Sequence, residues 1–87
     1  MKKYFEVRRI LEPKGYSYIE MTKEGVYVIA MNSSGKVCLF DSNANPLDAQ
    51  NNEISIEKDS NKENCYIIKI NNYITEYSPQ DKQILDS

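Results

Sequence analysis

The feature that most constrains this chain is the spacing of its apolar residues between residues 16 and 77. They recur at every second position or form short apolar runs, and each run ends near Gly, Asn, Ser or Asp. A spacing of two places side chains on one face of a β-strand, whereas a helix requires a spacing of three to four. The pattern predicts six strands: Tyr16–Met21, Val26–Asn32, Lys36–Asp41, Glu53–Glu57, Cys65–Ile70 and Tyr73–Tyr77.

Two of these segments also predict their place in a sheet. Val26–Asn32 is almost wholly apolar, which is typical of a central strand buried on both faces. It is followed by an Asn-Ser-Ser-Gly turn and Lys36–Asp41, which together predict a hairpin. Glu53–Glu57 instead alternates cleanly between acidic or polar residues and Ile, as expected for an edge strand with one face in water.

The two ends of the chain have a different pattern. Residues 3–11 place Tyr4, Val7, Ile10 and Leu11 on one arc of a helix, ahead of Pro13 and Gly15. A strand leading into a hairpin at residues 12–15 is the alternative. Ser78-Pro79-Gln80-Asp81 has the pattern of a helix start, so a short helix is predicted over Pro79–Asp86.

These elements predict the α+β class. We expect one domain over residues 1–87, because 87 residues are the length of a single small core. Its architecture should be a small antiparallel β-meander of five to six strands, with an N-terminal helix across one face and a short C-terminal helix.

The residues that the chain lacks exclude most types of active site. There is no His and no Trp, and the only two Cys, Cys38 and Cys65, are far apart in sequence. A Ser-His-Asp or Cys-His nucleophile and a Cys/His zinc site are therefore excluded. No spacing of carboxylates selects an acid–base pair, so we expect no enzymatic activity and no catalytic residues.

One loop has the spacing of a calcium ligand. Residues 41–48 carry oxygen-bearing side chains at alternate positions, as calcium-binding loops do. Pro46 stands where such a loop needs Gly, however, and Asn52 stands where it needs Glu. We therefore expect an Asx-rich connection between strands, with no metal and no cofactor.

Composition also bears on origin and compartment. Ile, Lys, Asn and Tyr are abundant and Gly, Ala, Arg and Pro are scarce, which indicates an AT-rich genome such as that of a low-GC bacterium, its phages or its mobile elements. The N-terminal residues are charged where a signal peptide is apolar, and no apolar run reaches the length of a membrane span. We expect a cytoplasmic protein with reduced thiols and no membrane partner.

The seven tyrosines are the strongest candidates for a binding surface. A small sheet cannot bury all of them, and an exposed Tyr is a large, stiff side chain that can also form hydrogen bonds. Tyr16 and Tyr18 are expected on one strand face and Tyr73 and Tyr77 on another. We predict that these four tyrosines contact a protein partner.

A basic N-terminal segment offers an alternative partner. Residues 1–14 contain five basic side chains against two acidic ones, and a nucleic acid would contact the basic ones: Lys2, Lys3, Arg8, Arg9 and Lys14. The whole chain has a formal net charge of −2, which disfavours nucleic acid as the partner.

Taken together, these observations predict a small protein-binding module. Its size and composition suggest an inhibitor of a host enzyme or defence system, encoded by a phage or mobile element, in the manner of anti-CRISPR proteins. A nucleic-acid-binding regulatory protein is the alternative. We also expect a homodimer through the Glu53–Glu57 edge or through the strand that carries Tyr66, Ile68 and Ile70.

Overall fold

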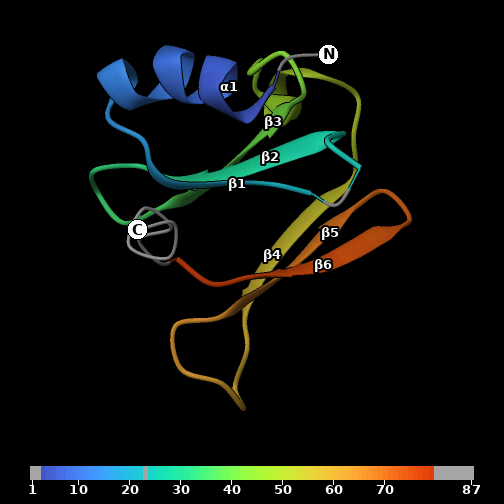
Figure 1. Cartoon of the computed structure of the whole chain (residues 1–87). Coiled ribbons are helices and arrows are strands. Elements are labelled where there is room, and N and C mark those ends of the chain that lie inside the picture. Colours follow the sequence, from blue (N-terminus) through green and yellow to red (C-terminus); the bar gives the residue numbers. More distant parts are fainter. Residues whose placement is uncertain (1–2, 23, 80–87) are drawn as a thin grey trace.

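In the part of the chain that the structure describes, one helix and two three-stranded antiparallel sheets form three layers (Figure 1). The structure, a computed structural model, describes residues 3–22 and 24–79. In the view of Figure 1, α1 (Tyr4–Leu11) lies across the top. The sheet of β1 (Ser17–Met21), β2 (Tyr27–Met31) and β3 (Val37–Asp41) lies below it. The sheet of β4 (Ile54–Lys58), β5 (Tyr66–Ile70) and β6 (Tyr73–Tyr77) forms the lowest layer.

The N-terminal segment is a helix, so the alternative strand reading of residues 3–11 is wrong. The backbone N–H of Lys3 donates to the Glu6 carboxylate at 3.2 Å, which satisfies one free donor at the start of the helix. Val7 and Leu11 are buried against the sheet. The helix continues into the 3-10 turn η1 (Glu12–Lys14), and Gly15 ends it with a left-handed φ of 94° that few other residues tolerate.

The middle sheet is covered on both faces, which confirms the prediction for its central strand. Val28 and Ala30 of β2 pack toward the helix, and Ile29 between them packs toward the second sheet. All three side chains are essentially inaccessible to solvent. A strand buried on both faces needs apolar residues at every position, which explains the continuous apolar run in this segment.

The expectation of a single meander is wrong, because the strands divide into two sheets. The division falls at residues 42–53, a connection that contains the 3-10 turn η2 (Leu47–Ala49). An apolar cluster joins the two sheets, with Ile29 and Leu39 from one and Ile68, Ile70 and Tyr77 from the other. In a single meander, the face of the first sheet opposite the helix would have been exposed to water. The helix expected over Pro79–Asp86 lies outside the described residues, apart from Pro79.

The two sheets are stacked so that their edges lie in pairs. On one side β1 lies near β6, because the Tyr77 hydroxyl donates to the backbone oxygen of Tyr18 at 2.6 Å. On the opposite side, β3 and β4 line one groove. We call these the β1/β6 side and the β3/β4 side.

Candidate binding groove

The groove on the β3/β4 side has a volume of about 350 Å³. Its walls come mainly from β3 and β4, with Tyr16 before β1 and two residues of the connection between the sheets. The lining residues are Tyr16, Lys36, Val37, Cys38, Leu39, Phe40, Pro46, Asp48, Ile54 and Ile56. Most of these side chains are apolar, and Ile56 leaves 39% of its surface exposed. An exposed apolar side chain in a hollow is typical of a contact surface.

The outer edge of β4 carries outward-facing backbone groups along the whole strand. Glu53 and Asp59 form backbone hydrogen bonds with Asn71 and Cys65, so the odd-numbered residues of this regular ladder bond to β5. The even-numbered residues Ile54, Ile56 and Lys58 therefore direct their N–H and C=O groups outward. Within the part of the chain that the structure describes, no strand pairs with this edge.

The outer edge of β3, in contrast, is partly covered by the chain that follows it. Phe40 forms an isolated antiparallel bridge with Pro46, and the Asp41 N–H donates to the Asn45 oxygen at 2.8 Å. Only the first part of β3, near Val37, is left open. The edge available for pairing on this side is therefore that of β4.

Asp41 holds the covering loop in place. One carboxylate oxygen accepts the backbone N–H groups of Asn43 at 2.8 Å and Asn45 at 3.0 Å, and the other accepts the Gln50 amide at 3.1 Å. Burial alone would raise the pKa of Asp41, but these hydrogen bonds outweigh it and lower the pKa. The loop is thus the Asx-rich connection that its sequence predicts.

Opposite charges stand at the two ends of the groove. Lys36 precedes β3, and Asp48 lies beside the Pro46 bridge at the other end of that strand. Both side chains are exposed, and neither forms an ion pair with another described residue. Polar groups at the ends and apolar groups between them resemble the rim and core of a protein interface.

Tyr16 and Cys38 form the wall nearest the helix. The Tyr16 ring packs edge-on against Phe40 with centroids 5.0 Å apart, and burial raises the pKa of its hydroxyl. Cys38 is half-buried, and its thiol donates weakly to the Lys36 oxygen at 3.8 Å. Cys65 is buried elsewhere, so the two thiols differ in exposure.

The structure places the other three candidate tyrosines away from this groove. Tyr18 is 43% exposed on the β1/β6 side. A β-bulge between Ser17 and Glu20 gives it a left-handed φ of 51°, which breaks the alternation expected to align it with Tyr16. Tyr73 is half-buried and its ring lies 5.6 Å from that of Tyr27.

Tyr77 is a core residue, so its prediction as an exposed anchor is corrected. Its side chain is 1% exposed and belongs to the cluster between the two sheets. Burial raises the pKa of its hydroxyl strongly, and the hydroxyl donates to Tyr18. A residue that ends a short strand of alternating pattern gives no sequence signal of such complete burial.

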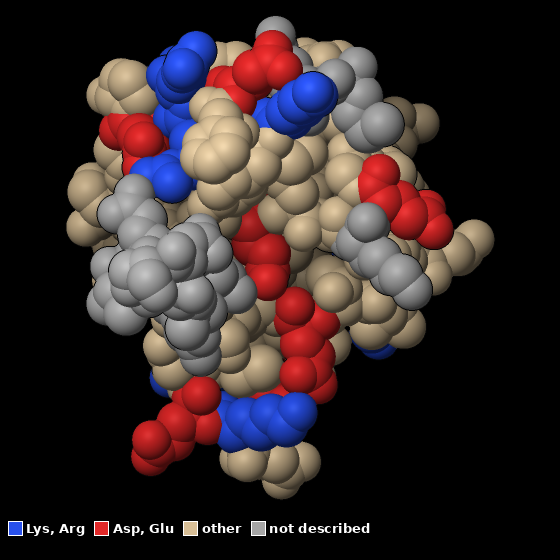
Figure 2. All heavy atoms as spheres, in the orientation of Figure 1, with Lys and Arg blue, Asp and Glu red and all other residues tan. Residues whose placement is uncertain are grey.

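The basic N-terminal residues do not all remain available. Arg8 forms an ion pair with Glu12 at 2.7 Å and lies 5.6 Å from the Tyr4 ring centroid, and the hydrogen bond to Glu12 raises its pKa. Arg9, Lys3 and Lys14 are exposed, whereas Lys2 lies outside the described residues. Figure 2 shows acidic atoms beside the Lys and Arg atoms on the part of the surface over α1. This view shows no continuous basic area.

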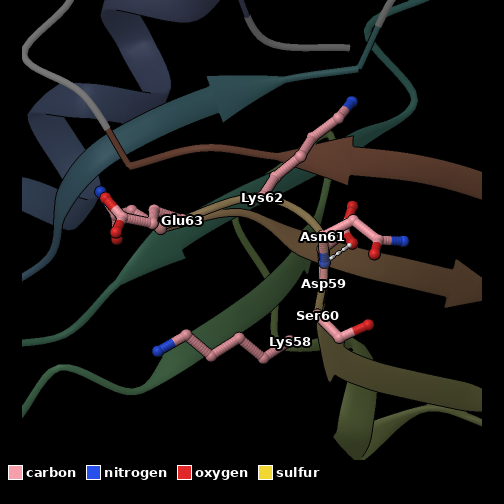
Figure 3. A pocket seen from close by; sticks show the side chains of 7 residues that line it. Lys58, Asp59, Ser60, Asn61, Lys62 and Glu63 are labelled. Carbon is pink, nitrogen blue, oxygen red and sulfur yellow. Dashed lines mark hydrogen bonds between the residues drawn. The ribbon is translucent and has the colours of Figure 1, made fainter.

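A second hollow, of about 720 Å³, lies in the loop between β4 and β5. Among the described residues, those that line it are residues 58–64, and the side chains labelled in Figure 3 point in different directions. Lys62 pairs with Glu76 of β6 at 3.2 Å, and the Asp59 carboxylate accepts the Asn61 N–H at 2.9 Å. The polar groups do not converge on a common point, so we assign no site to this hollow.

Two features are absent from the described residues. Among them, no three His, Cys, Asp or Glu side chains are grouped to hold a metal ion. Within the same residues, no helix has the length and apolar character needed to cross a membrane.

Sequence reasoning identified Tyr16 but missed most of the groove. The alternating Glu53–Glu57 pattern correctly predicts that β4 is an edge strand, and this is the signal that could have pointed to Ile54 and Ile56. No local pattern shows that β3 lies beside it. Comparisons of the chain with protein families, with curated proteins and with solved structures give no match.

Proposed function

We propose that this protein is a small protein-binding module whose binding surface is the groove on the β3/β4 side. The observation that carries the proposal is that an apolar groove and an unpaired strand edge coincide at Ile54 and Ile56. Strand edges of this kind bind extended segments of partner proteins through backbone hydrogen bonds, with side-chain pockets adding selectivity.

The shape and lining of the groove favour a protein over a small molecule. A volume of about 350 Å³ is near the lower end of the roughly 300–1,000 Å³ typical of small-molecule pockets. Its charged side chains, Lys36 and Asp48, lie at the ends and are exposed, whereas small-molecule sites direct polar groups at the ligand. An extended peptide would pair with the open edge of β4 and contact the charged side chains at the two ends of the groove.

The proposed kind of partner rests on the amino-acid composition of the chain. A protein encoded on a phage or mobile element would inhibit a host enzyme or defence system by capturing an extended segment of it. Tyr16 is the predicted tyrosine that contributes to this surface. Among the described residues, the nucleic-acid alternative depends on Arg9, Lys3 and Lys14, since Arg8 is paired with Glu12.

Two matched isoleucine variants test the proposal. Ile56 and Ile74 are both exposed and lie on the two edge strands of the same sheet, but only Ile56 lines the groove. We would attach the full chain, Ile56→Glu and Ile74→Glu to beads and expose each to a nuclease-treated lysate of a low-GC bacterium. The proposal requires a protein retained by the wild type and by Ile74→Glu but lost from Ile56→Glu. Identical retention by all three would contradict it.

A further inference from the structure

We propose that the segment bound in the groove is an extended strand that adds antiparallel to β4 and alternates apolar with basic residues. This inference rests on the proposed function and specifies the chemistry of the partner. It derives from the two faces of β4, which differ in their side chains. An added strand would continue the sheet and place its own side chains alternately on the same two faces.

The inner face of β4 requires apolar side chains from the partner. Ile54 and Ile56 point toward the groove, opposite Ile70 and Ile68 in the ladder. A strand added to β4 would direct every second side chain over these residues, toward Val37 and Leu39 across the groove. Apolar side chains there would remove Ile56 from water and so add to the affinity that the backbone hydrogen bonds provide.

The outer face of β4 requires basic side chains. Ser55 and Glu57 lie on this face, and by alternation Glu53 and Asp59 follow the same row just beyond the ends of the strand. None of these three carboxylates forms an ion pair with another described residue. Opposite charges directly across a strand pair stabilise it, and like charges destabilise it. Lys or Arg on the partner strand would therefore be selected.

The same row of acids disfavours a second copy of this chain as the occupant. In an antiparallel pair of β4 edges, even-numbered residues bond to even-numbered ones, so odd-numbered residues face odd-numbered ones. The odd-numbered row contains three acids and Ser55 but no basic residue. Every such register therefore places acids against acids or Ser, which is a common protection of edge strands. β5 is the central strand of its sheet, so it has no free edge to which a second copy could add as a strand.

The test uses two capped synthetic peptides of equal length, one alternating Lys with Val and the other alternating Glu with Val. Each is titrated into the isotopically labelled full chain, and binding is followed by the NMR shifts of backbone amides. We expect the Lys–Val peptide to bind about tenfold or more tightly than the Glu–Val peptide. The shifts should centre on Ile54, Ile56 and Lys58.

The contributions of charge and of backbone hydrogen bonds to peptide binding are then tested separately. Glu57→Gln should weaken binding of the Lys–Val peptide, whereas Glu63→Gln, in the loop after β4, should leave it unchanged. N-methylation of the valines removes the donors that would face β4 and should weaken binding about tenfold. N-methylation of the lysines removes donors on the far side and serves as the matched control.

The outcomes separate this inference from the proposed function. Equal binding of both peptides at β4 would overturn the requirement for basic residues. Shifts away from β4, no binding, or equal effects of the two N-methylation patterns would overturn strand addition. None of these results changes whether a lysate protein depends on Ile56 but not Ile74, which is the test of the proposed function.

Discussion

The β1/β6 side and the β3/β4 side of this molecule are both formed by edge strands, but the surroundings of these edges differ. On the β1/β6 side, two edge strands are tied together by the Tyr77 hydroxyl, which donates to Tyr18. On the β3/β4 side, the edges instead flank an apolar groove, and the outward backbone groups of β4 have no partner strand among the described residues. One pair of edges is therefore linked by a side-chain hydrogen bond, whereas the other pair flanks an open groove.

Backbone geometry also distinguishes the edge strands β1 and β4. The β1/β6 side contains the bulge at Tyr18, where a bulky residue adopts a φ of 51° that L-residues rarely occupy. The β4–β5 ladder is regular from Ile54 to Lys58. The strained conformation is maintained by the contacts around it, which makes stability sensitive to changes on that side. Changes at the edge of β4 should affect binding instead.

The largest expected effect is that of Tyr77→Ala. Removing a fully buried aromatic side chain leaves a cavity between the sheets and deletes the hydrogen bond to Tyr18. We expect the free energy of unfolding to fall by about 3–5 kcal/mol, measured by urea unfolding. Tyr73→Ala, at a half-buried position on the same strand, should cost clearly less. Equal losses would contradict the assignment of Tyr77 to the core.

A smaller effect with a pH signature is expected for Tyr77→Phe. At neutral pH the loss of the hydroxyl should cost about 1–2 kcal/mol, because the ring stays buried. Burial raises the pKa of Tyr77 in the folded state above its ordinary value of 10.0. The unfolded chain therefore loses this proton first. The corresponding stability is complete below pH 10 and declines as the pH rises beyond it.

Urea unfolding of both proteins across this alkaline range checks the sign. The wild type should lose stability more steeply than Tyr77→Phe as the pH rises, because the other tyrosines and lysines titrate in both proteins. If the free energy of unfolding falls with pH equally in both proteins, the Tyr77 hydroxyl is not buried in the folded state.

The bulge is tested by comparing Tyr18→Gly with Tyr18→Ala. Both variants lose the tyrosine side chain, and they differ only in the Cβ atom. Gly usually destabilises a strand relative to Ala, but at a left-handed φ the order reverses. We expect Tyr18→Gly to be the more stable variant by about 1 kcal/mol in thermal unfolding. If Tyr18→Ala is instead the more stable variant, residue 18 has a standard strand conformation.

The smallest effects on stability are expected at two exposed positions on the edge strands of the second sheet, Ile56 of β4 and Ile74 of β6. Ile74→Glu should change the free energy of unfolding by about 0.5 kcal/mol or less, and Ile56→Glu, whose side chain is 39% exposed, by about 1 kcal/mol. Urea unfolding of the two variants checks this. A large loss in Ile56→Glu alone would show that the groove is part of the core and is not a binding surface.

Much of this fold follows from local patterns, and the parts that do not are informative. The apolar run of β2 predicts burial on both faces, and the alternation of β4 predicts an edge strand. A strand buried on both faces already requires a second covering layer besides the helix. Which strands provide that layer depends on contacts between segments far apart in sequence, and no local spacing encodes them.

The candidate site was less predictable for the same reason. Tyr16 was expected at a binding surface because aromatic residues are frequent there, and it lines the groove. Tyr77 follows the same rule, yet it is buried, because β6 directs it between the sheets. The groove itself forms where β3 and β4, from different sheets, come together. Its charged ends, Lys36 and Asp48, have no unusual sequence context.

Amide hydrogen exchange of the free protein, followed by NMR, tests the central claim most directly. If the outer edge of β4 is open, Ile54, Ile56 and Lys58 should exchange rapidly, whereas Ser55 and Glu57, which bond to β5, should be protected. Protection of both sets would contradict the claim, because it would mean that the edge of β4 is already paired in the free protein.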